Sequence, residues 1–218
     1  MTYSGAVKVG GPADVHELTD LMISKVAVGP LENNAYVLRC RATDAQLLID
    51  AADEPRTLLQ LIGDGGLTGV VTTHQHGDHW QALAEVVAAT GARTYAGRYD
   101  AAGIPVSTDV LVEDGDTLRF GRIELTARHL TGHTPGSIAL VYDDPHGHPH
   151  VFTGDCLFPG GVGNTGQDPE AFASLISDVE SKLFGQLPDE TWVYPGHGRD
   201  TTLGAERPHL PEWRARGW

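Results

Sequence analysis

The chain has 218 residues, of which 40% are hydrophobic, and a formal net charge of −14 at pH 7. This much apolar material is enough for a sizeable core and excludes a disordered chain, and no Pro-, Ser- or charge-rich linker divides it, so we expect one domain over residues 1–218. The 15 Lys and Arg residues are scattered along the sequence, which argues against a nucleic-acid partner because phosphate binding needs clustered positive charge.

Membrane binding has equally little support in the sequence. No apolar run approaches the roughly 20 residues that cross a bilayer, and the first residues lack an apolar stretch flanked by positive charge. Cys40 and Cys156 have no CxxC spacing, and so few cysteines agree with a reducing compartment. We therefore expect no membrane association and a cytoplasmic location.

The first half of the chain predicts an antiparallel sheet followed by a strand, a loop and a helix. Short runs of β-favouring residues between Gly, Pro and Asp turns indicate strands at 21–28, 34–40, 46–52 and 67–74. A helix is expected at roughly 54–62. Apolar residues at helical intervals predict a second helix in 79–91, ending at a glycine.

The second half repeats this pattern of short strands and turns and implies a second sheet. Strands are expected at 93–97, 109–115, 116–120, 122–130, 137–144, 150–155 and 190–198. An amphipathic helix follows Asp168 and ends at Phe184. The core then covers about 21–198, and 199–218 forms a polar C-terminal tail with two tryptophans. Helices outside two mixed sheets predict an α/β fold, a four-layer αββα sandwich, although periodicity alone does not fix that stacking.

The strongest chemical signal is the segment that begins at His74 and ends at His79. It holds three imidazoles and one carboxylate, at His74, His76, Asp78 and His79, where a predicted strand ends and a helix begins. Divalent metals of borderline softness prefer imidazole nitrogen with some carboxylate oxygen. Gly77 supplies the bend that lets one short segment face two positions. A polar loop with surface histidines is the alternative, which the further candidate ligands make less attractive.

Three more segments each run from a strand into a loop with one metal-capable residue. They carry His133, Asp155 and His197, and each of these lies next to glycine. Glycine permits close approach of the backbone to a buried ion. Taken singly, His133 and His197 are equally well explained as turn histidines, and Asp155 as an Asx-turn residue. Together with the first cluster they make seven ligands, enough for two ions if one carboxylate bridges.

These residues resemble the H-x-H-x-D-H signature and the later single ligands of the metallo-β-lactamase superfamily, over roughly 21–198. The resemblance implies that one metal is held by His74, His76 and His133, the other by Asp78, His79 and His197, with Asp155 bridging. Two zinc ions are expected, and iron and manganese, which relatives also carry, are possible. A metal-bridging hydroxide would then attack the substrate, and Asp78 would orient that hydroxide.

Within the superfamily, the segments GHTPGS, TGDCLF and PGHG look most like glyoxalase II (hydroxyacylglutathione hydrolase) and its short single-domain relatives. That likeness implies a hydrolase that cleaves the carbonyl of a small-molecule thioester or ester. Glyoxalase II proper has a C-terminal helical domain that helps to bind glutathione, whereas only residues 199–218 follow the last ligand here. The acyl group, its thiol or alcohol carrier and the oligomeric state therefore stay open.

Three other functions are compatible with the same residues. Persulfide dioxygenases of the superfamily look similar and use one iron held by two histidines and an aspartate. A lactonase differs only in how the acyl group is presented. A binding module that has kept the fold and lost the chemistry is disfavoured because all seven ligands are present.

Several conspicuous residues have weaker claims to function. The histidine-rich stretch 143–150 lies between two predicted strands and is interpreted as a solvated hairpin. Cys156 follows the proposed bridging aspartate, and we expect it in the core because adjacent strand residues point to opposite faces. Trp80 and Phe158 either line a substrate pocket or pack, with nothing in the sequence to decide between them.

Overall fold

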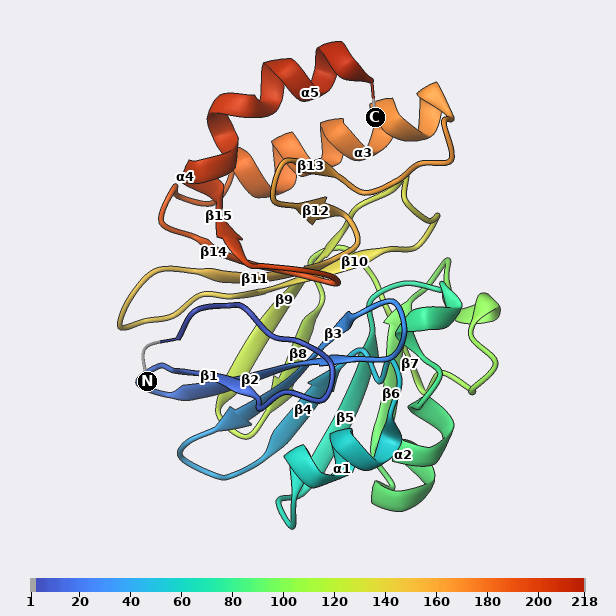
Figure 1. The fold of residues 1–218 in the computed structure, drawn as a ribbon, viewed down its shortest axis with the longest axis vertical. Helices are drawn as coiled ribbons and strands as arrows, with labels where there is room; N and C mark the ends of the chain where they lie inside the picture. Colours follow the sequence, from blue (N-terminus) through green and yellow to red (C-terminus); the bar gives the residue numbers. More distant parts are fainter. Residues whose placement is uncertain (1–2, 218) are drawn as a thin grey trace.

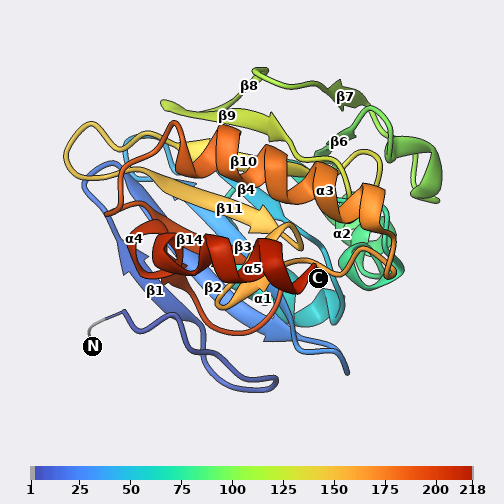
Figure 2. The ribbon, with the colours of Figure 1, turned by 90° about the horizontal axis from the view of Figure 1, so that it is seen from above.

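Two β-sheets packed face to face, with helices on both outer sides, make up the computed structural model, which describes residues 3–217 (Figure 1). Both sheets are mixed, because β4–β7 pair in parallel in the first sheet and β11 pairs in parallel with β14 in the second. The view from above shows α3 and α5 lying across the strands of the second sheet (Figure 2). The predicted αββα layering is confirmed.

The first sheet has the strand order β1-β2-β3-β4-β5-β6-β7. Its strands are β1 (Asp14–Glu17), β2 (Leu21–Val28), β3 (Asn33–Cys40), β4 (Gln46–Ile49), β5 (Leu67–Thr72), β6 (Arg93–Gly97) and β7 (Val110–Val112). The second sheet has the order β15-β14-β11-β10-β9-β8. Its strands are β8 (Thr117–Phe120), β9 (Ile123–His129), β10 (Ile138–Tyr142), β11 (His150–Gly154), β14 (Trp192–Pro195) and β15 (Thr201–Thr202).

A small hairpin and the helices complete the chain. The hairpin is formed by β12 (Leu157–Phe158) and β13 (Gly161–Val162). The α-helices are α1 (Pro55–Ile62), α2 (Leu83–Thr90), α3 (Pro169–Asp178), α4 (Leu203–Glu206) and α5 (Leu210–Arg216). Three short 3₁₀ turns, η1 (Gly77–His79), η2 (Ala101–Gly103) and η4 (Arg207–His209), and one π-helical turn, η3 (Val179–Phe184), extend or connect them. Among residues 3–217, no helix is long and apolar enough to cross a membrane.

Strand alternation divides the buried side chains into three cores, one between each pair of layers. In β3, Tyr36 and Leu38 join the core between the sheets, whereas Ala35 and Val37 join the core under α1 and α2. This division follows from the two-residue repeat of a strand, which sends neighbouring side chains to opposite faces. A third core, which includes Cys156, lies between the second sheet and α3 and α5. The expectation that Cys156 is a core residue is confirmed, since its side chain is fully buried.

The strands at 93–97 and 109–115 were expected in the second sheet, and the structure shows this to be wrong. Both join the first sheet as β6 and β7, in parallel with β5. The reason is topological: α2 connects β5 to β6, and a strand–helix–strand crossover returns the chain parallel to the strand it left. The hairpin expected at 143–150 is present between β10 and β11. It is less solvated than expected, because Asp144 and His150 are buried.

The segment 199–218, expected as a polar tail, is largely structured in the described residues. β15 pairs with β14, and α5 packs its Trp213 side chain, 1% exposed, into the core beside α3. The expected helix at 79–91 begins only at Leu83, after the η1 turn. The sequence also gave no sign of β1 or of the β12–β13 hairpin.

Candidate metal centre

All seven predicted metal ligands meet where strands of the two sheets end on one side of the sandwich. His74 to His79 follow β5 of the first sheet, His133 lies in the β9–β10 connection, Asp155 directly follows β11, and His197 follows β14. Their ligand atoms fall into overlapping groups, each within 4.8 Å, which are His74-His76-His133, His74-His79-Asp155 and Asp78-His79-His197. Residues more than a hundred positions apart in sequence thus share one site.

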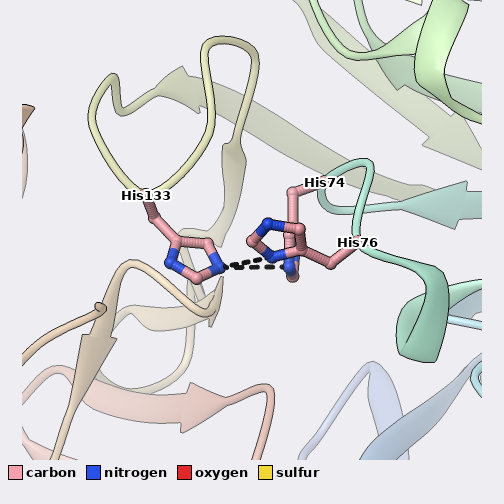
Figure 3. A group of neighbouring side chains, drawn as sticks. All are labelled: His74, His76 and His133. Atoms are coloured by element: carbon pink, nitrogen blue, oxygen red, sulfur yellow. Dashed lines mark hydrogen bonds between the residues drawn. The ribbon is translucent and has the colours of Figure 1, made fainter. Parts of the chain in front are cut away.

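The first group consists of three imidazoles that point toward one another (Figure 3). His133 Nε2 lies 3.0 Å from His76 Nδ1 and 3.2 Å from His74 Nε2. Three nitrogens on a tetrahedral zinc ion, each about 2.0–2.1 Å from the metal, would stand roughly 3.3–3.4 Å apart. The spacing of the three imidazoles therefore fits a single ion of this size.

The second group combines two imidazoles with a carboxylate. Asp78 Oδ2 lies 3.4 Å from His197 Nε2 and 3.6 Å from His79 Nε2. Asp155 stands between the two groups, with Oδ1 3.4 Å from His79 Nε2 and Oδ2 3.7 Å from His133 Nε2. A carboxylate in this position can offer one oxygen to each of two ions.

Four of the five histidines have a second ring nitrogen whose partner lies outside the cluster. His79 Nδ1 contacts the Asp50 carboxylate at 2.9 Å, and His74 Nδ1 the Thr73 hydroxyl at 3.1 Å. His133 Nδ1 donates to Asn164 O at 2.7 Å and His197 Nδ1 to Leu31 O at 3.0 Å. A carboxylate or carbonyl partner fixes the proton of a neutral imidazole on Nδ1, so in that form Nε2 carries the lone pair that faces the site.

Two supporting residues were not identified as functional from the sequence. Asp50, 2% exposed and in the left-handed region at φ 57°, accepts from Thr73 N and the Thr73 hydroxyl and contacts His79. Asn33 Nδ2 donates to Asp78 Oδ2 at 2.8 Å. The aspartate at the end of a short apolar strand was the available signal for Asp50, whereas nothing in the sequence set Asn33 apart.

Unsatisfied buried atoms show that the donor set fits a cation. Among the described residues, His79 Nε2 and Asp155 Oδ1 are buried without a hydrogen-bond partner, and they face each other across 3.4 Å. Leaving such atoms without a partner costs roughly 1–3 kcal/mol each, so they need a compensating group. A divalent ion bound by imidazole nitrogen and carboxylate oxygen supplies that compensation.

Burial and neighbouring charges set the protonation states of the ligands. Burial lowers the pKa of His74 well below its ordinary value, and the neighbouring His79 adds to that effect. Burial also lowers the pKa of His79, but the carboxylates of Asp50 and Asp155 outweigh it and raise that pKa to about 10. Burial raises the pKa of Asp155, and the imidazoles of His197 and His79 more than reverse this, holding it far below its usual range. The site therefore offers at least one neutral imidazole and an ionised carboxylate to a cation.

Glycines next to the ligands allow the loops to approach closely, as expected. A Cβ atom on Gly196 would stand 2.1 Å from Asp155 Oδ1, and one on Gly163 would stand 1.7 Å from Asp155 O. No side chain fits at either position without moving Asp155. Of the two aromatic residues left undecided, Phe158 lies with its ring centroid 6.4 Å from that of His197, whereas the Trp80 indole donates to Gln75 O.

The family model described as the metallo-beta-lactamase superfamily matches residues 28–197, which include every one of these ligands. The chain belongs to this superfamily. Metal-dependent hydrolases make up most of it, and divalent metal binding goes with its fold. The match ends at the last predicted ligand, His197.

Relatives within the superfamily carry different functional names. The chain is 34% identical over 180 residues to a hydroxyacylglutathione hydrolase from Polaromonas, covering 81% of this chain and 66% of that protein. It is 35% identical over 167 residues to the human mitochondrial persulfide dioxygenase ETHE1, covering 74% of this chain and 62% of that one. The chain thus spans slightly less than two thirds of the length of each of these two proteins.

A solved structure with similar coverage of both chains is TTHA1623, crystallised in a di-iron-bound form. It has a TM-score of 0.68 and 35% sequence identity, and the alignment covers 84% of this chain and 96% of that one. TTHA1623 therefore shares the fold and is of comparable length, and its crystal structure is of a di-iron-bound form.

Proposed function

We propose that the protein is a binuclear metal-dependent hydrolase that cleaves the carbonyl of a thioester or ester, as glyoxalase II does. One observation carries this proposal: seven metal-ligating side chains form two adjoining groups, and Asp155 lies within contact distance of both. In this assignment His74, His76 and His133 would hold one ion, Asp78, His79 and His197 would hold the other, and Asp155 would be shared between them. Zinc is the favoured metal because imidazole nitrogen dominates the donor set, with iron and manganese as alternatives.

Bound divalent ions would supply Lewis-acid chemistry here, that is, a water pKa lowered from about 15.7 towards 7 and a polarised substrate carbonyl. The chain's own residues hold and orient the reactants. Burial raises the pKa of Asp78, but the hydrogen bond from Asn33 and the neighbouring His79 together outweigh it and leave that pKa below its usual value. Asp78 is therefore an ionised acceptor at neutral pH, able to orient the attacking water.

The proposed substrate is a small-molecule thioester or ester, and its carrier is not assumed to be glutathione. The relative named as a hydroxyacylglutathione hydrolase is longer than this chain, and the alignment covers 66% of it. A panel of thioesters with different carriers, together with lactones, is the direct way to find the preferred one.

A persulfide dioxygenase is the second candidate, because the human enzyme of that name is 35% identical over 167 residues. The two reactions differ in their demand for oxygen, since hydrolysis consumes none. We expect the purified protein to contain close to two equivalents of metal by elemental analysis, to hydrolyse a thioester, and to consume no oxygen with glutathione persulfide. One equivalent of iron together with persulfide-dependent oxygen uptake would replace the hydrolase by the dioxygenase.

A further inference from the structure

Asp100 is a buried carboxylate that belongs to neither group of candidate ligands. It follows β6 at the start of the η2 turn, and its residue is 0% exposed. A carboxylate held away from solvent in this way is costly unless its oxygens are hydrogen-bonded. The partners of those oxygens therefore show which part of the structure depends on it.

Those partners lie in two separate ligand loops. Asp100 Oδ2 accepts from Gln75 N at 2.9 Å, and Gln75 stands between His74 and His76. The same oxygen accepts from the Thr134 hydroxyl at 2.5 Å, and Thr134 directly follows His133. Asp100 Oδ1 accepts from Gly136 N at 2.7 Å in that second loop. One carboxylate thus connects the loops that carry all three histidines of the first group.

The β6–η2 corner also packs closely against the loops that carry His76 and His133. A Cβ atom on Gly97 would stand 2.0 Å from Gly136 O, and one on Gly136 would stand 2.4 Å from Asp100 N. On the other side, a Cβ atom on Gly103 would stand 2.1 Å from the Gln75 side-chain oxygen. The β6–η2 corner therefore packs backbone to backbone with the His133 loop and against the Gln75 side chain, and Asp100 supplies the polar bonds at that junction.

We propose that Asp100 is a positioning residue that sets the spacing between the His74–His76 pair and His133, and so the metal affinity of the three-histidine group. This inference rests on the metal-binding role proposed above. Among the described residues, Asp100 contacts no imidazole, so it acts through the backbone of the loops. Asp50 differs because it contacts the His79 ring directly, and through the Thr73 hydroxyl it also reaches His74.

The substitution Asp100→Asn tests this role at almost constant shape. An amide keeps one acceptor oxygen but turns a donor toward Gln75 N and the Thr134 hydroxyl, or toward Gly136 N. Replacing groups that orient metal ligands typically weakens metal binding about 10–100-fold, and we expect this change in one of the two Zn²⁺ binding steps. A chromophoric chelator in competition with the protein measures both steps, and urea unfolding of the metal-free protein measures stability separately.

Two further variants separate positioning from general stability. Asp109 accepts hydrogen bonds from Thr94 N and the Thr94 hydroxyl at the same edge of the first sheet, away from both loops. Asp109→Asn is therefore a control at an exposed position for the loss of a carboxylate acceptor, and we expect it to leave both Zn²⁺ affinities within about twofold. Asn33→Ala is expected to weaken the other binding step, because it removes the donor to Asp78 of the second group.

The outcomes distinguish this inference from the proposed function. Wild-type protein that binds no Zn²⁺ overturns the proposed function itself. If the wild type binds two ions and Asp100→Asn binds both with unchanged affinity, the inference about Asp100 is wrong and the hydrolase remains. The same holds if Asp100→Asn weakens the binding step that Asn33→Ala weakens. Should Asp100→Asn fail to fold, Thr134→Val decides: removal of one bond to the carboxylate is expected to weaken one step by about threefold or more, and unchanged affinity overturns the inference.

Discussion

The buried ion pair between Lys25 and Asp200 allows a quantitative test of how the last ligand loop is held. Lys25 Nζ donates to Asp200 Oδ1 at 2.6 Å, and the side chains are 0% and 1% exposed. The same ammonium group donates to Gly5 O and to Gly198 O, each at 2.8 Å. Gly198 adjoins His197, so this pair ties the N-terminal segment to the loop that carries the last ligand.

Replacement of Lys25 by methionine is expected to lower the free energy of unfolding by about 3–5 kcal/mol at pH 8, because it leaves a buried carboxylate without its counter-charge. No discount for solvent screening applies, since both side chains are almost fully buried. The exposed pair of Arg39 and Asp44 is the control: Arg39→Met is expected to change stability by about 1 kcal/mol or less. Urea unfolding with a chelator present, which removes any metal contribution, measures both variants.

The pH dependence of the stability lost in Lys25→Met follows from the titration of the Asp200 carboxyl group. In the wild type, burial raises the pKa of Asp200 and Lys25 lowers it. Without Lys25, burial is opposed only by the hydrogen bonds from the Tyr3 hydroxyl and the Trp192 indole, so the pKa of Asp200 rises further. The folded variant then binds a proton at a pH where its unfolded chain does not. A raised carboxyl pKa favours the folded state at low pH, and the benefit disappears as the pH rises through the folded pKa. The loss should therefore be smaller at pH 5 than at pH 8, and a loss below about 1 kcal/mol at pH 8, or one that does not shrink at pH 5, refutes the reasoning.

Three further predictions concern the site and the C-terminal segment. Asp155→Asn should reduce bound metal from two equivalents to one or fewer by elemental analysis, and two full equivalents would contradict its bridging position. Asp78→Ala should abolish thioester hydrolysis while its circular dichroism stays that of the wild type; an undiminished rate in the metal-loaded variant rules out the role assigned to it. Trp213→Ala should destabilise the protein by about 3–5 kcal/mol because it empties a fully packed site, whereas Leu111→Ala, at a position 41% exposed, should change stability by about 0.5 kcal/mol or less.

The candidate ligands, which the structure brings together, could be located from the sequence because their chemistry is concentrated and locally marked. Three imidazoles and a carboxylate within six residues, and single ligands beside glycines at strand ends, are rare combinations with few structural explanations. The supporting residues lack such marks. Asp100 is one aspartate among many, and its function depends on two loops that meet it only after folding. A single sequence cannot indicate which loops contact Asp100 in the folded protein.

The fold was predictable at the level of elements and layers, less so in the pairing of strands. Periodicity located β6 and β7 but did not say which sheet they join, since a strand's partners depend on the connection before it. Here α2 between β5 and β6 was the informative feature, because such a connection favours a parallel neighbour. In the C-terminal segment, Leu203, Leu210 and Trp213 are the apolar anchors, and so few of them among polar residues gave too weak a pattern to predict helices.

Hydrogen bonds to residues outside the cluster fix the candidate ligand nitrogens in place at this edge of the sandwich. His79, His133 and His197 each place Nδ1 against an oxygen acceptor outside the cluster, so the geometry at Nε2 does not depend on a bound ion. Ligands fixed beforehand lose little conformational freedom when metal binds, which raises affinity without adding contacts. If that is the basis of binding, substitutions of buried residues that touch no metal, such as Asp50 and Asp100, should weaken affinity more than substitutions of exposed residues nearer the ions.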